Sequence, residues 1–211
     1  MRILDSERVD EAHIISAAVD CIIAGGTLIF PTETVYGIGA AAENDDAIAA
    51  VFRAKARPLD KPLALHVSGE AQAMPFVAAW TPSAQRASRL FWPGPLAIIV
   101  RRDVHRARAA SAGLATISLR CPDQGLTHAI IQRTGPLAAT SANASGQAPF
   151  TGADAQAELP SASLAIFAGP TALQRESTIM DCTQEPPRVL RWGALEEARL
   201  VAAMGTLGRR E

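Results

Sequence analysis

The sequence predicts an α/β fold, because short apolar runs that suit strands alternate with segments whose apolar residues recur at helical spacing. Residues 28–30 and 63–67 predict strands, and residues 44–54 between them predict a helix. The chain has 211 residues, of which 48% are hydrophobic, so it is long enough to bury a substantial core. We therefore expect one α/β domain over residues 1–211.

The other elements continue the alternation. A first helix is predicted from a cap at Asp5 or Ser6 to the pair Gly25 and Gly26, where glycine ends it. Further helices are predicted over residues 71–79, 82–90, 126–133 and 195–204. Further strands are predicted over residues 96–100, 115–119, 137–139, 164–167, 177–181 and 188–191.

Two loops that follow predicted strands carry groups suited to a small polar ligand. Thr32, Glu33 and Thr34 follow the strand 28–30, and residues 140–146 form a loop of small residues after the strand 137–139. Such a loop lets backbone and short polar side chains approach a ligand, although the same composition also forms ordinary turns. Because α/β proteins bind ligands where strands end, we expect the active site at one edge of the sheet.

Basic residues gather at the exit of the predicted helix 44–54. Arg53, Lys55 and Arg57 precede Pro58, which stops the helix, and Lys61 follows. Cations here also complement the helix dipole, so an ordinary basic helix end is the alternative to an anion site.

Charge and cysteine content exclude some classes of function. Lys and Arg number 20 against 21 Asp and Glu, a formal net charge of −1, so no global basic field indicates nucleic-acid binding. The basic run 101–108 is typical of a solvated loop, with RNA contact as the alternative. Cys21, Cys121 and Cys182 form no pair with metal-site spacing and predict neither a zinc site nor a disulfide framework.

Two further segments are interpreted as follows. The turn at residues 91–95, Phe-Trp-Pro-Gly-Pro, lies between a predicted helix and a strand, so its rings are expected in the core. The N-terminus has no secretory apolar segment, and no run approaches transmembrane length, so we expect a cytoplasmic protein.

Several separated motifs occur in one order along residues 18–195: PTETVYGIGA, KARPLDKPLALHV, FWPGPL, ATSANASG, STIMD and VLRWGAL. In this combination the chain resembles the YrdC-like family of L-threonylcarbamoyladenylate synthases, in its short single-domain form. The resemblance implies a twisted, open mixed sheet flanked by helices, with a concave ligand-binding surface. It also implies ATP, L-threonine and bicarbonate as substrates. The products would be threonylcarbamoyl-AMP and pyrophosphate, and acceptor proteins would use the adenylate to modify tRNA.

The resemblance also implies residue roles. Lys55 and Arg57 would be the catalytic cations, no protein metal ligand is implied, and Mg²⁺ would be carried by the triphosphate. Lys61 departs from the family pattern, in which asparagine is common at this position. The threonine contacts would be Thr34, His66, Arg120, Ser141 and Ser177. The ATP contacts would be Arg57, Lys61, Thr116, Asn143, Thr151 and Arg191.

Two alternatives belong to other functional classes. A non-catalytic, RNA-binding member of the same fold would use the basic run 101–108 and would need no threonine pocket. A carbamoyl-transfer module of hydrogenase maturation proteins would lie within a much longer chain, beside acylphosphatase and zinc-finger segments that this sequence does not show.

Overall fold

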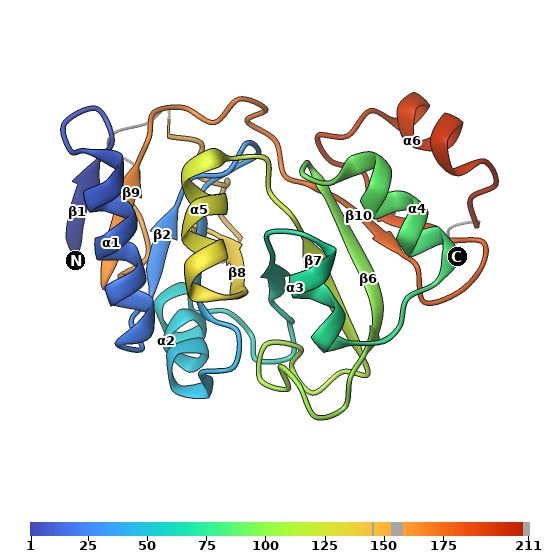
Figure 1. The fold of residues 1–211 in the computed structure, drawn as a ribbon, viewed down its shortest axis with the longest axis horizontal. Coiled ribbons are helices and arrows are strands. Elements are labelled where there is room, and N and C mark those ends of the chain that lie inside the picture. Colours follow the sequence, from blue (N-terminus) through green and yellow to red (C-terminus); the bar gives the residue numbers. More distant parts are fainter. Residues whose placement is uncertain (145, 153–157, 209–211) are drawn as a thin grey trace.

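A mixed sheet of eleven strands runs through the computed structural model, which describes residues 1–144, 146–152 and 158–208 (Figure 1). The strand order is β1-β9-β2-β3-β8-β4-β7-β6-β10-β11, and β5 pairs with β6 beside this path. The predicted α/β fold with a mixed sheet is confirmed. The strands are β1 (Arg2–Asp5), β2 (Leu28–Phe30), β3 (Gly37–Ala41), β4 (Ala64–His66), β5 (Val77–Ala79), β6 (Leu96–Arg102), β7 (Thr116–Arg120), β8 (Leu137–Ser141), β9 (Leu164–Phe167), β10 (Thr178–Asp181) and β11 (Arg188–Arg191).

Neighbouring strands at the centre of the sheet do not share one direction. β2 pairs antiparallel with β3, β3 antiparallel with β8, and β8 antiparallel with β4. β4 is parallel to β7, with His66 in register with Arg120. The C-terminal ends of β2 and β8 therefore point opposite to those of β4 and β7.

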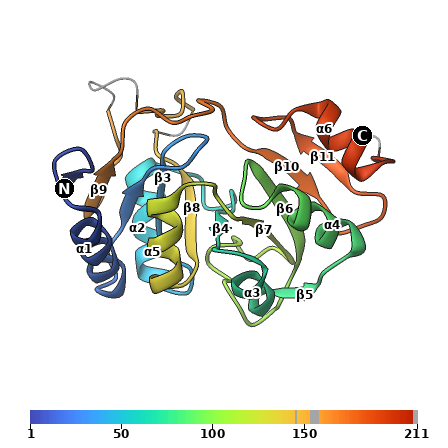
Figure 2. The same ribbon diagram turned by 45° about the horizontal axis from the view of Figure 1, so that its top comes forward.

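Helices cover the two faces of the sheet unequally. α1 (Glu11–Ile23) and α5 (Gly125–Thr134) lie side by side and pack on one face of the β9–β2 half, around Phe30 and Leu137 (Figure 1). The opposite face carries the larger core, formed with α2 (Asp45–Lys55), α4 (Pro82–Phe91) and α6 (Glu197–Met204). α4 and α6 are neighbours (Figure 2). Short helical turns, α3 (Glu70–Ala73) and η1 (Met74–Phe76), precede β5.

Local signals explain where α2 begins and ends. The Asn44 side chain accepts a hydrogen bond from the Ala47 N–H at 3.0 Å, which caps the first turn. The helix ends at Ala56, which has a left-handed backbone with φ of 49°. Lys55 is consequently delivered, buried, to the end of the helix beside β8.

Three local predictions are wrong. Residues 2–5 form the edge strand β1 rather than a helix cap, and the cap of α1 is Asp10, which accepts from the His13 N–H. No strand was predicted over residues 37–41, but they form β3, which pairs with β2 and β8; Gly39 lets it approach β8 so closely that a Cβ would come within 2.8 Å of the Ala138 carbonyl oxygen. Residues 71–79, predicted as one helix, divide into α3, η1 and β5.

Two arginines of the basic run at 101–108, Arg102 and Arg106, form hydrogen bonds within the protein. The buried Arg102 guanidinium donates to the carbonyls of Leu114, Asp103, Val104 and Arg106. Arg106 makes two 2.6 Å contacts with the Glu43 carboxylate. Arg102 and Arg106 therefore stabilise the loop through contacts within the protein, which makes them less available to RNA.

The rings of the turn at residues 91–95 were predicted to lie in the core. Phe91 is buried and the Trp92 indole donates to the Leu96 carbonyl at 2.8 Å, so the turn at 91–95 packs as expected. All three cysteines are free. Across the described part of the chain, no helix has both the length and the apolar character needed to cross a membrane.

Candidate active site

A cavity of about 390 Å³ lies on the sheet face that also carries α1 and α5. Its floor is formed by alternate residues of six neighbouring strands, which the strand register places on one side of the sheet. These floor residues are Gly37, Ala139, Ser141, Ala64, His66, Ser118, Arg120, Ala97, Ile99 and Ile179.

The prediction of a site at one edge of the sheet is therefore wrong. In a mixed sheet, strands of opposite direction do not end at a common edge, so polar residues that follow β2 and β7 cannot meet there. They meet instead because the segment 31–36, between β2 and β3, brings Thr34 to the Arg120 guanidinium, 2.7 Å away. The concave surface implied by the family resemblance describes this arrangement better.

Three cations and one carboxylate surround the cavity besides Arg120. Arg57 donates from Nε and Nη2 to the carbonyls of Lys61 and Pro62 at 3.0 and 2.8 Å. Its Nη1 has no hydrogen bond to another described residue. Arg191 binds the Ser177 carbonyl and contacts Glu176. Against a chain of net charge −1, this is a local concentration of positive charge.

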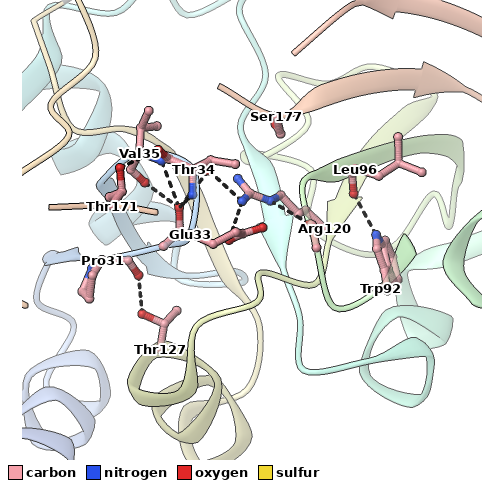
Figure 3. A network of polar contacts seen from close by, with 12 residues as sticks. Pro31, Glu33, Thr34, Val35, Trp92, Leu96, Arg120, Thr127, Thr171 and Ser177 are labelled. Atoms are coloured by element: carbon pink, nitrogen blue, oxygen red, sulfur yellow. Dashed lines mark hydrogen bonds and ion pairs between the residues drawn. The ribbon is translucent and has the colours of Figure 1, made fainter. Parts of the chain in front are cut away.

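Arg120 is held beside the cavity by three different residues. Its Nη2 donates to the Thr34 hydroxyl and forms an ion pair with Glu33 Oε2 at 2.8 Å, and its Nε reaches the Gly94 carbonyl at 3.4 Å (Figure 3). The Arg120 and Glu33 side chains are only 6% and 9% exposed. Within the described residues, Nη1 has no hydrogen-bond partner.

The loop that carries Glu33 and Thr34 is itself fixed from several directions. Thr32 donates to the Val35 carbonyl at 2.6 Å, and Thr127 of α5 donates to the Pro31 carbonyl at 2.6 Å (Figure 3). The long connection from β9 to β10 adds the Thr171 hydroxyl, which donates to the Thr34 carbonyl at 2.7 Å. The loop therefore presents the Glu33 carboxylate and the Thr34 hydroxyl to the Arg120 guanidinium in a fixed position.

His66 is neutral in this environment. Burial, reinforced by the positive charge of Arg120, lowers the pKa of His66 to about 3. Its ring contacts Phe30 edge-on with a centroid separation of 5.7 Å, and its buried Nδ1 has no hydrogen-bond partner among the described residues. An imidazole of this kind can accept or donate one hydrogen bond to a ligand without adding charge.

Lys55 lies beside the cavity rather than in its lining. Its ammonium donates to the carbonyls of Ser141 and Asn143, and burial together with Arg57 lowers the pKa of Lys55 to about 8. The Asn143 amide in turn donates to the carbonyls of Ala144 and Gln147, while its Oδ1 is buried with no hydrogen-bond partner among the described residues. Lys55 therefore holds the loop after β8.

The expected site residues thus fall into two groups. Ser145 of the expected loop lies outside the described residues. Seven residues line the cavity: Arg57, Lys61, His66, Arg120, Ser141, Ser177 and Arg191. Five others do not line it: Thr34, Lys55, Thr116, Asn143 and Thr151. Thr34 contacts Arg120, and Lys55 and Asn143 make contacts within the loop after β8. Thr116 lies on the cavity face of β7, four residues before Arg120, and the Thr151 carbonyl accepts from the Thr171 N–H.

Sequence reasoning missed two acidic residues and one hydroxyl. Glu33 was noted only as part of a polar loop, and Glu176 was not singled out, because a carboxylate in a loop carries no pattern of its own. Ser118 lines the floor two residues before Arg120. The alternation within residues 115–119, which places Ser118 opposite the buried Ile117, could have identified it.

Comparison with known proteins shows the family to which the chain belongs. The sequence profile of the Sua5/YciO/YrdC family, described as "Telomere recombination", matches residues 20–193. The chain belongs to this family. The matched segment contains every residue that lines the cavity.

Relatives in the Sua5/YciO/YrdC family include proteins with an assigned activity. The chain is 37% identical over 183 residues to the threonylcarbamoyl-AMP synthase of Bacillus subtilis, covering 84% of this chain and 53% of that protein. It is 34% identical over 193 residues to the putative threonylcarbamoyl-AMP synthase of Mycobacterium tuberculosis H37Rv, covering 90% and 89%. The chain thus spans about half the length of the first relative.

A solved structure of the family supports the fold directly. The crystal structure of Pyrococcus abyssi Sua5 complexed with L-threonine superposes with a TM-score of 0.88 at 33% identity. The match covers 98% of this chain and 62% of that one. The twisted mixed sheet expected from the motifs is therefore confirmed.

Proposed function

We propose that this chain is an L-threonylcarbamoyladenylate synthase, a nucleotidyltransferase that makes threonylcarbamoyl-AMP and pyrophosphate from L-threonine, bicarbonate and ATP. The observation that carries the proposal is the gathering of Arg57, Lys61, Arg120 and Arg191 around one cavity of about 390 Å³ on the sheet face. The assigned activity of relatives and the threonine complex of a family member support it.

The threonine end of the proposed site is the Arg120 side. Arg120 Nη1 would bind the carboxylate, because Nη2 and Nε are already engaged by Glu33, Thr34 and Gly94. His66, Ser141 and Ser177 line the cavity around it and can pair with the amine and hydroxyl of the substrate. Thr34 would act through Arg120, because its own hydroxyl is buried against the guanidinium.

The nucleotide end is the side with the three remaining cations. Arg57 Nη1 and the Lys61 ammonium are free of hydrogen bonds to described residues and can meet phosphate oxygens. Arg191 would join them from β11. Asn143, Thr116 and Thr151 would contribute polar contacts at the margin, and Lys55 would act by holding the loop after β8 in place.

The chemistry needs no protein nucleophile. The amine of threonine attacks the bicarbonate carbon with loss of water, and a carboxylate oxygen of the resulting carbamate attacks the α-phosphorus while pyrophosphate leaves. The protein's contribution is to orient the reactants and stabilise the charge that develops on the phosphates. Bound Mg²⁺ would supply further neutralisation of the triphosphate. Glu176, the acidic residue among the described cavity-lining residues, offers the oxygen donor that this ion takes alongside phosphate oxygens.

The test is a product assay. Purified protein is incubated with ATP, bicarbonate and radiolabelled L-threonine, and pyrophosphate and a threonylcarbamoyl adenylate are measured. Omission of bicarbonate and replacement of Arg57 by alanine should each abolish both products. Retention of fold in the variant is checked by circular dichroism, and product formation independent of bicarbonate would contradict the proposal.

The proposal extends to partners and location. An adenylate of this kind is a reactive intermediate, so we propose transient contact with the proteins that transfer threonylcarbamoyl to tRNA, in the cytoplasm. The rival RNA-binding interpretation has less support, because Arg102 and Arg106 of the basic run are bound within the protein.

A further inference from the structure

Glu176 contacts a cation that the proposed function assigns to ATP. Its Oε2 lies 2.9 Å from Nη1 of Arg191, and the two side chains are 40% and 39% exposed. Glu176 is also the one acidic side chain among the described residues that line the cavity. A carboxylate is therefore already paired with Arg191 at the cavity.

The Arg191 guanidinium and the Glu176 backbone are each held by other contacts. Arg191 donates from Nε and Nη2 to the Ser177 carbonyl, at 3.2 and 2.9 Å, which leaves Nη1 as its exchangeable end. The Glu176 carbonyl accepts from the Ala194 N–H at 2.8 Å. Gly193 packs so closely on this backbone that a Cβ would lie 2.2 Å from the same carbonyl oxygen. The segment thus keeps the Glu176 carboxylate beside the cavity.

The ion pair itself can exchange readily. Exposed pairs of this kind contribute little to stability, so a multiply charged anion can displace the carboxylate from Arg191. The displaced carboxylate would then face the triphosphate, and two anions in contact repel each other. A divalent cation between them removes the repulsion, and Mg²⁺ is typically held by one or two carboxylates together with phosphate oxygens and water.

We infer that Glu176 makes nucleotide binding depend on a divalent cation, by leaving Arg191 and supplying a carboxylate oxygen to the cation that the triphosphate carries. This inference rests on the proposed function. Glu176 would thereby exclude metal-free ATP and other simple anions from the cation-rich cavity, and would select the magnesium complex of ATP.

Calorimetric titration of ATP tests the inference in four conditions: wild type and Glu176→Gln, each with excess MgCl₂ or with EDTA. Glutamine keeps the size of the side chain and lacks its charge. The ratio of the two Kd values, EDTA over MgCl₂, should fall about tenfold or more in Glu176→Gln, corresponding to about 1.4 kcal/mol. Metal-free ATP should bind the variant more tightly than wild type, and MgATP more weakly. Glu197→Gln, an exposed position on α6, is the matched control and should leave the ratio unchanged.

The outcomes separate the two claims. If wild type binds MgATP and the ratio of the Kd values in EDTA and MgCl₂ is the same in Glu176→Gln, the inference is overturned and the proposed function stands. Wild type that fails to bind MgATP would overturn both. As a direct readout, crystals grown with ATP and MnCl₂ should show an anomalous peak within coordination distance of the Glu176 carboxylate. A peak that contacts phosphate oxygens alone would reject the inference.

Discussion

Glu33 and Arg120 form a buried ion pair, with 2.8 Å between Oε2 and Nη2 and less than a tenth of either side chain exposed. Removing one partner of a buried pair leaves an uncompensated charge, which typically costs about 3–5 kcal/mol. We predict a loss of this size in the free energy of unfolding of Glu33→Ala, measured by urea denaturation. Glu43→Ala, which removes the exposed pair with Arg106, is the control and should cost at most about 1 kcal/mol. Equal losses in the two variants would show that burial does not matter here.

The Lys55 ammonium is predicted to make stability depend on alkaline pH. Its pKa is lowered from 10.5 to about 8 in the folded protein, so the unfolded chain binds more protons between these values. The free energy of unfolding of wild type, relative to Lys55→Met, should therefore rise by about 1–3 kcal/mol as the pH increases from 8 to 10.5. Denaturation of both proteins across this range measures the difference. A difference that stays constant would mean that Lys55 keeps its ordinary pKa.

His66 is predicted to stay neutral throughout the physiological range. The pKa of His66 is about 3 in the folded protein, against an ordinary histidine value of 6.5, so the unfolded chain binds one more proton between these values. The free energy of unfolding should therefore decrease as the pH falls below 6.5. In ¹⁵N-histidine spectra, the signal assigned with a His66→Gln variant should keep the chemical shifts of neutral imidazole from pH 8 to pH 5. An inflection of that signal within this range would contradict the burial argument.

Gly193 is predicted to be intolerant of any side chain. A Cβ there would lie 2.3 Å from the Ser177 carbonyl carbon, so Gly193→Ala must displace the segment that carries Glu176 and Ser177. Overpacking of this kind costs about 1–3 kcal/mol, and ATP affinity should fall with it. Gly125→Ala has open space at its Cβ and begins helix α5, so it should be neutral or slightly stabilising. Thermal unfolding and calorimetric titration of both variants decide the matter, and an unchanged ATP affinity in Gly193→Ala would detach this glycine from the site.

The sequence predicted most elements because their periodicity is strong. Strand β11 was predicted with its observed bounds, and α4 and α5 to within one residue. β1 and β3 were missed for physical reasons. The partner of β1 is β9, more than 150 residues further along the chain, and most of β1 is exposed. β3 contains two glycines and has no local apolar alternation, although one of its partners, β2, shortly precedes it.

The candidate site was predictable in its members but not in its position. Arg57, Arg120 and Arg191 could be selected by motif, but the face on which they meet depends on strand direction, which single-sequence patterns do not encode. The same limit hid Glu33 and Glu176. Their significance lies in the arginine that each contacts, and those contacts join segments 87 and 15 residues apart.

The central claim is that the cavity on the sheet face binds L-threonine through Arg120, and calorimetric titration of L-threonine into wild type and Arg120→Lys tests it most directly. Lysine keeps the charge but cannot hold Glu33, Thr34 and Gly94 while presenting a further nitrogen to a carboxylate. We predict that threonine binds wild type, that affinity falls at least about tenfold in Arg120→Lys, corresponding to about 1.4 kcal/mol, and that ATP affinity changes little. Equal threonine affinity in a folded Arg120→Lys variant would contradict the claim.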